Sequence, residues 1–219
     1  MSGDIKTIDG PRVLPASGGD PKSLVILCHG YGSNGYDLIG LVPLWREALP
    51  DTAFVSPNAP EPCPGAPGGH QWWDLSSRNL QERESGVRRA APVLDRFIDA
   101  ELNRYSLAED RLALVGFSQG TMLALHVATQ RDRPVAGVVA YSGMIADEGA
   151  IRSARSKPPV LLTHGDRDPV LPIAAFHEAK ALLESSGFEL TTHISRGMAH
   201  SIDNECLRLG REFLKRVLI

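Results

Sequence analysis

Hydrophobic residues along the chain gather in short runs that alternate with longer amphipathic stretches. The runs are rich in Val, Ile, Leu and Ala and predict strands at 24–28, 53–56, 112–117, 135–141, 160–164 and 190–195. The stretches between them predict helices at 36–49, 86–105, 119–131, 173–186 and 202–217. Most runs are continuously apolar, as in a parallel sheet that helices cover on both faces. The pattern predicts an α/β fold with a doubly wound, mostly parallel sheet.

One segment, residues 57–73, departs from this alternation. It contains five prolines and three glycines in seventeen residues, which disfavour regular helix and strand and predict a long surface loop. Loops of that length in a compact domain are often lids or binding loops. Trp72 and Trp73 close the segment, and we expect them either to anchor the loop or to line a substrate groove.

The length and charge of the chain narrow the classes of function. A chain of 219 residues fits one domain spanning 1–219. Its 23 Lys+Arg and 26 Asp+Glu give a net charge of −3, which disfavours a nucleic-acid partner. No apolar run approaches the roughly 20 residues that span a bilayer, and we expect neither a signal peptide nor a lipid anchor.

The cysteines point to a reducing compartment. Cys28, Cys63 and Cys206 are odd in number and lack CxxC spacing, so neither a disulfide framework nor a zinc site is expected. Cys28 lies in an apolar run and is expected in the core, whereas Cys63, among prolines, is expected to be exposed. We predict a cytoplasmic protein with no metal, and the sequence leaves a homodimer open.

The strongest local motif is Gly116-Phe117-Ser118-Gln119-Gly120, a GxSxG that directly follows an apolar run. In a nucleophile elbow a serine occupies a tight turn between strand and helix, and the glycines let neighbouring backbone pass close by. Alone, the pattern is weakly specific. The predicted strand before it and the predicted helix after it supply the structural context that the mechanism requires.

A serine nucleophile needs a base and an acid that orients the base. In the chain order typical of such an elbow, the acid and then the histidine follow the serine on loops beyond later strands. Of seven histidines, only His200 follows both an acid-bearing loop and the last strand. Asp166 and Asp168 share one turn; we favour Asp168, because Pro169 restricts its backbone, while Asp166 suits a turn-capping role.

The tetrahedral intermediate of acyl transfer also needs two oxyanion donors. The first is the N–H of Gln119, the residue after the nucleophile. The second is expected from the glycine-rich turn after the first strand, and we choose the N–H of Tyr31. The alternative is that this turn is only a flexible connection.

Several motifs, taken in order, resemble the small serine carboxylesterases of the α/β-hydrolase fold, a family that includes acyl-protein thioesterases and lysophospholipases. The resemblance covers most of the chain. Its motifs are His29-Gly30-Tyr31-Gly32, Trp72-Trp73-Asp74, Glu84-Ser85-Gly86-Val87, Gly116-Phe117-Ser118-Gln119-Gly120, His164-Gly165-Asp166-Arg167-Asp168-Pro169 and Gly197-Met198-Ala199-His200-Ser201.

The resemblance implies a triad of Ser118, Asp168 and His200, with Tyr31 and Gln119 as oxyanion donors. It settles Asp168 over Asp166. It also implies hydrolysis of esters or thioesters of small to medium acyl groups through an acyl-enzyme, without a cofactor. We expect Trp72, Trp73, Thr121 and Met122 to contact substrate. The alternatives are a peptidase or lactone hydrolase on the same fold, and a non-catalytic binding module.

Overall fold

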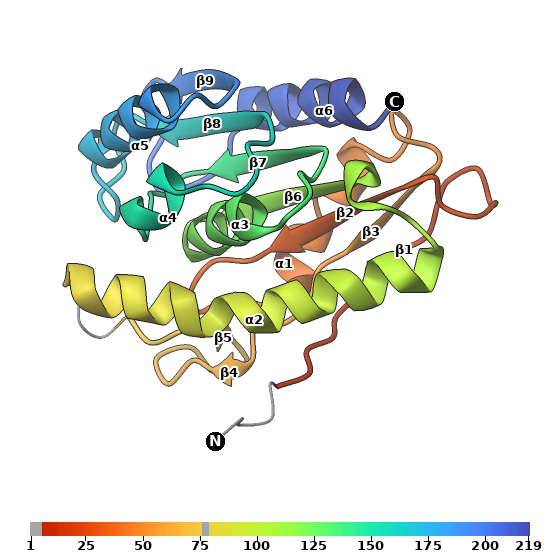
Figure 1. Cartoon of the computed structure of the whole chain (residues 1–219), viewed down its shortest axis with the longest axis horizontal. Coiled ribbons are helices and arrows are strands. Elements are labelled where there is room, and N and C mark those ends of the chain that lie inside the picture. Colours follow the sequence, from red (N-terminus) through yellow and green to blue (C-terminus); the bar gives the residue numbers. More distant parts are fainter. Residues whose placement is uncertain (1–5, 76–78) are drawn as a thin grey trace.

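The computed structural model describes residues 6–75 and 79–219, which fold around one seven-stranded sheet (Figure 1). The strand order is β1-β3-β2-β6-β7-β8-β9, and all neighbouring strands are parallel except β1 and β3. The sheet strands are β1 (Arg12–Val13), β2 (Ser23–Cys28), β3 (Thr52–Val55), β6 (Leu112–Phe117), β7 (Gly137–Tyr141), β8 (Val160–Gly165) and β9 (Leu190–Ser195). The predicted α/β class with a doubly wound sheet is confirmed.

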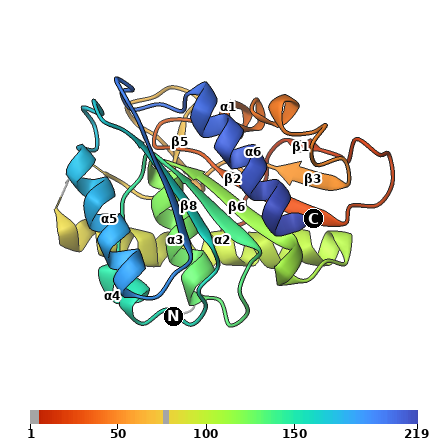
Figure 2. The same ribbon diagram turned by 90° about the horizontal axis from the view of Figure 1, so that it is seen from above.

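Helices cover both faces of this sheet (Figures 1 and 2). On one face lie α2 (Leu80–Tyr105), α3 (Gln119–Gln130), α4 (Glu148–Arg152) and α5 (Ile173–Ser185); on the other lie α1 (Gly35–Ile39) and α6 (Asn204–Leu218). Side chains of a strand point alternately to the two faces. Accordingly, Leu24 and Ile26 of β2 pack in a first core, between the sheet and helices α2 to α5. Val25 and Leu27 pack in a second core, between the sheet and helices α1 and α6. This double burial explains why the strands read as continuous apolar runs.

The helix predicted at 36–49 is wrong in its extent. Helix α1 ends at Ile39, and a 3₁₀ turn (Val42–Leu44) follows it. Gly40 caps α1, and Pro43, which has no backbone N–H, lies at the start of the 3₁₀ turn. Apolar side chains of this segment do pack in the second core. The periodicity therefore predicted their burial correctly, but it did not predict the break in the helix.

The segment 57–73 is mostly loop, but it contains two short strands that we did not predict. β4 (Glu61–Pro62) and β5 (His70–Gln71) pair antiparallel. The prediction that Cys63 is exposed is also wrong, because its side chain is buried. The turn between the strands folds back, with the N–H of Cys63 donating to the carbonyl of Gly69. A short hairpin thus encloses a thiol that composition alone places at the surface.

Candidate active site

The serine of the GxSxG motif lies where β6 ends and α3 begins. Ser118 has φ 54° and ψ −115°, a backbone conformation that side-chain-bearing residues rarely adopt. Such strain persists only where the surrounding structure imposes it, and it is frequent at functional sites. The turn raises the Ser118 side chain out of the sheet and into a cavity.

The two glycines of the motif are required by close backbone contacts. A Cβ on Gly120 would lie 1.9 Å from the carbonyl oxygen of Cys28, and one on Gly116 would lie 2.5 Å from Cα of Thr121. These distances leave no space for a side chain. The steric reason inferred for the motif from its spacing therefore holds in the structure.

The loop after β2 packs directly against the serine. A Cβ on Gly30 would lie 3.4 Å from Cβ of Ser118, so the two backbones are neighbours. Among the described residues, neither the N–H of Tyr31 nor that of Gln119 has a hydrogen-bond acceptor. The Gln119 group is also the first N–H of α3, where the helix dipole favours negative charge. Two unpaired donors thus flank the serine.

The side chain of His29 holds this loop in place. Its Nε2 accepts the N–H of Ala59 at 3.0 Å, so Nδ1 carries the proton and donates to the carbonyl of Gly30 at 2.8 Å. The indole N–H of Trp72 donates to the carbonyl of His29 at 2.9 Å. Burial lowers the pKa of His29 to about 4, so its ring is neutral near pH 7.

This histidine is expected to make the fold sensitive to mild acid. The unfolded chain binds a proton at the ordinary pKa of 6.5 and the folded chain only at about 4, so stability falls as the pH drops through that window. Between pH 7 and pH 5 the loss is about 2 kcal/mol. Urea unfolding at both pH values checks this. In the His29→Gln variant the difference between the two pH values should shrink by that amount; an unchanged difference would contradict it.

The side chain of Gln119 joins the elbow to the segment 57–73. Its Oε1 accepts the N–H of Trp72 at 3.0 Å, and its Nε2 donates to the carbonyl of Trp73 at 2.8 Å. Gln119 is fully buried, so both contacts are shielded from water. Gln119, whose backbone N–H is expected from the sequence to bind the oxyanion, thus also holds the end of the segment 57–73 with its side chain.

Asp168 and His200 meet on adjacent loops. They follow β8 and β9, which pair in parallel, so their loops leave the same edge of the sheet. Nδ1 of His200 lies 2.6 Å from Oδ2 of Asp168. The ring of Phe117 packs against the imidazole at 4.9 Å between centroids, and the hydroxyl of Ser142 donates to the carbonyl of Ser201, the next residue in the His200 loop.

The carboxylate of Asp168 is kept ionised by its neighbours. Burial alone would raise its pKa, but hydrogen bonds from His200 and from the N–H groups of Leu171 and Val170 outweigh burial and lower the pKa below 3.8. Both N–H groups donate to Oδ1, that of Val170 at 2.8 Å and that of Leu171 at 2.9 Å, which leaves Oδ2 for the imidazole of His200. A fixed negative charge therefore faces His200 over the neutral pH range.

The other two candidates in the acid loop have different positions. Asp166 is exposed, and its carboxylate accepts the N–H of Gly197 at 2.6 Å. His164 is buried and donates from Nε2 to the carbonyl of Leu171 at 2.8 Å. Asp166 therefore fastens its loop to the loop that carries His200, rather than capping its own turn, and His164 supports the turn that carries Asp168.

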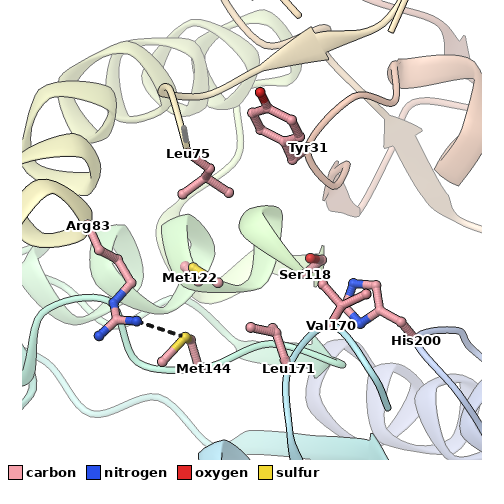
Figure 3. Close-up of a pocket in the computed structure, with 9 residues that line it drawn as sticks. All are labelled: Tyr31, Leu75, Arg83, Ser118, Met122, Met144, Val170, Leu171 and His200. Atoms are coloured by element: carbon pink, nitrogen blue, oxygen red, sulfur yellow. Dashed lines mark hydrogen bonds between the residues drawn. The ribbon is translucent and has the colours of Figure 1, made fainter. Parts of the chain in front are cut away.

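A cavity of about 410 Å³ opens beside the serine (Figure 3). Ser118 and His200 lie next to each other at one end of it, on the right-hand side of the view. Its walls are otherwise mostly apolar, as is usual for small-molecule sites. The lining residues are Tyr31, Leu75, Arg83, Ser118, Met122, Met144, Val170, Leu171 and His200.

Of the four side chains expected to contact substrate, only Met122 lines this cavity. Trp72 and Trp73 are each 2% exposed, and the indole of Trp72 anchors the loop after β2 through the carbonyl of His29. Thr121 is fully buried, and its hydroxyl donates to the carbonyl of Tyr141 at 2.8 Å. The indole of Trp72 therefore makes an anchoring contact, one of the two roles that the sequence left open for the pair.

The sequence pattern of the phospholipase/carboxylesterase family matches residues 11–218. The chain belongs to this family of α/β-hydrolases. Esterase YpfH of Escherichia coli (strain K12) is 28% identical over 195 residues, which cover 89% of this chain and 82% of that protein. Acyl-protein thioesterase 1 of Schizosaccharomyces pombe is 29% identical over 204 residues, covering 89% and 90%. The protein is a serine hydrolase of esters or thioesters.

Solved structures agree with this membership in the phospholipase/carboxylesterase family. The crystal structure of esterase PE8 has a TM-score of 0.93 and 40% identity, and the match covers 97% of this chain and 100% of that one. SOBER1 of Arabidopsis thaliana, at 23% identity and a TM-score of 0.80, covers 90% and 99% and shares the fold.

Five cavity residues of this hydrolase were not found from the sequence: Leu75, Arg83, Met144, Val170 and Leu171. Val170 and Leu171 directly follow the acid turn, a position from which a role beside the active site could have been inferred. Arg83 and Met144 come from α2 and from the loop after β7, and no local motif marks them.

In the described part of the chain, no helix is long and apolar enough to cross a membrane, and no three His, Cys, Asp or Glu side chains could together hold a metal.

Proposed function

We propose that the enzyme hydrolyses carboxylic esters or thioesters through an acyl-enzyme on Ser118, with His200 as general base and Asp168 as the acid that orients it. The observation that carries this proposal is the 2.6 Å contact between His200 and Asp168 at the end of the cavity that Ser118 also lines. An imidazole whose Nδ1 proton is held by a carboxylate presents its other nitrogen as a base.

The reaction has two steps. His200 takes the hydroxyl proton of Ser118 as the oxygen attacks the carbonyl carbon, and the N–H groups of Tyr31 and Gln119 stabilise the oxyanion. The imidazolium then gives its proton to the departing alcohol or thiol. In the second step His200 takes a proton from water, the hydroxide attacks the acyl-enzyme, and the acid leaves as the proton returns to Ser118.

The cavity supports acyl groups of small to medium size. Its roughly 410 Å³ lies near the low end of the usual range for small-molecule sites, and apolar side chains line most of it. We place the reaction in a reducing cytoplasm, a setting that suits three buried and unpaired cysteines.

A fluorophosphonate probe tests the nucleophile. We expect the intact enzyme to form a covalent adduct that peptide mass spectrometry locates on Ser118. Ser142 provides an internal control, because it shares a positive φ at a strand end but is fully buried. Absence of an adduct, or an adduct on another serine, would argue against the proposed mechanism.

A further inference from the structure

Arg83 is the only arginine or lysine among the described residues that line the active-site cavity. It lies on the first turn of α2, at the end of the cavity opposite Ser118 (Figure 3). Its Nη1 donates to the sulfur of Met144 at 3.3 Å, and its Nε is buried with no acceptor in the part of the chain that the structure describes. A thioether is a weak acceptor, so the guanidinium is poorly satisfied.

Arg83 differs from the other half-buried arginines in that it has no carboxylate partner among the described residues. Four described arginines are half-buried, and three of them form ion pairs with carboxylates: Arg12 with Glu101, Arg131 with Asp99 and Arg211 with Glu212. Arg83 has no carboxylate within ion-pair distance among the described residues. Withdrawing a charge from water without a partner costs free energy, so buried charges are normally paired. An anion supplied by a ligand would complete the pair.

We propose that Arg83 binds a carboxylate at the far end of the substrate's acyl group, so that the preferred substrates are half-esters or half-thioesters of dicarboxylic acids. The inference rests on the proposed function, since it needs the acyl group attached to Ser118. A guanidinium presents two parallel N–H donors that match the two oxygens of a carboxylate. A single arginine fits this ligand in charge and in shape.

The walls between the two ends of the cavity suit a methylene chain. Met122, Met144 and Leu171 lie between Ser118 and Arg83 in Figure 3, and Met122 is only 4% exposed. Methionine side chains adapt their shape to apolar ligands. An acyl chain that extends from the serine therefore reaches the guanidinium across apolar surface.

The part of the ester that extends from Ser118 toward Arg83 is the acyl group rather than the alcohol. Tyr31 and Val170, which lie near the serine end of the cavity, are 40% and 46% exposed, so this end opens to solvent and offers an exit for the alcohol. The acyl group stays bound through both steps of the reaction. A contact made by its terminal carboxylate is therefore retained after the alcohol has left.

The test compares two matched series of substrates. One contains nitrophenyl half-esters of adipic, suberic and sebacic acid, and the other contains the same esters with a terminal carboxamide in place of the carboxylate. For the intact enzyme we expect a higher kcat/KM on the carboxylate series. In Arg83→Met the ratio of the two kcat/KM values should fall about 10- to 100-fold, mostly through KM, because the contact exists before and during the reaction.

Arg89→Met is the matched control, because Arg89 is an exposed arginine on the same helix and lines a separate cavity. Its ratio should equal that of the intact enzyme. Where Arg83→Met fails to fold, Arg83→Lys gives the same readout with a smaller fall, because lysine cannot make two parallel hydrogen bonds. A ratio that Arg83 variants leave unchanged overturns the inference. If the intact enzyme hydrolyses neither series, the proposed function itself fails.

Discussion

Replacing Ser118 by alanine is expected to lower kcat by about 10⁴- to 10⁶-fold, the range seen when a triad nucleophile is removed. Alanine keeps the Cβ that the strained turn already accommodates, so the fold should persist while the attacking oxygen is lost. The remaining activity would come from substrate binding and the two oxyanion donors. Steady-state hydrolysis of a nitrophenyl ester at saturating substrate measures the change.

The matched control for this variant is Ser106→Ala. Ser106 also has a φ of 54°, but it caps the far end of α2 and lies outside the cavity. Its kcat should stay near that of the intact enzyme, whereas thermal unfolding reports any cost of the backbone conformation in both variants. Should Ser118→Ala retain more than about a tenth of the activity, Ser118 is not the nucleophile.

The second large effect is expected for Asp168→Asn, which should lower kcat by about 10⁴-fold, as in other triads. Asparagine keeps an oxygen that can accept the N–H groups of Val170 and Leu171, so the turn should stay folded. Its amide N–H₂, however, would face Nδ1 of His200 and favour the tautomer that carries the proton on Nε2. A ring in that tautomer cannot accept the proton of Ser118.

Asp166→Asn serves as the control for this substitution, because it makes the same change two residues away. The Asp166 carboxylate is exposed and contacts the N–H of Gly197, not the imidazole. We expect it to retain nearly full activity. Equal losses in the two variants would mean that the turn, rather than the Asp168 charge, supports the reaction; measured kcat and unfolding midpoints separate these outcomes.

The parts of the site that could be predicted from sequence are those in which one residue's role depends on its near neighbours. The elbow required Gly116 and Gly120 beside Ser118, and the loops after β8 and β9 had to leave one sheet edge because their strands are parallel neighbours. These constraints are local or topological. They could be read before any distance was known.

The parts that could not be predicted depend on contacts between distant segments. Trp72 and Trp73 have the same aromatic character whether they line a groove or anchor a loop, and the anchoring contact is made with His29, 43 residues before Trp72 in the chain. Arg83 resembles any arginine of an amphipathic helix until Met144 approaches it from the loop after β7. The exposure of Cys63 was wrongly predicted for the same reason, since its buried thiol lies against the loop after β2, 3.9 Å from where a Cβ on Gly32 would be.

The double hydrogen bond of Gln119 to the main chain at Trp72 and Trp73 has a consequence for how this enzyme can vary. In the proposed mechanism the main-chain N–H of Gln119 donates to the reacting carbonyl, while the side chain of Gln119 holds the end of the segment 57–73. An insertion or deletion between residues 57 and 73 that displaces the main chain at Trp72 and Trp73 would therefore tilt the first turn of α3. It would lower kcat although the altered residues do not contact the substrate. The length of the segment 57–73 is therefore constrained by the position that the backbone N–H of Gln119 must keep beside Ser118.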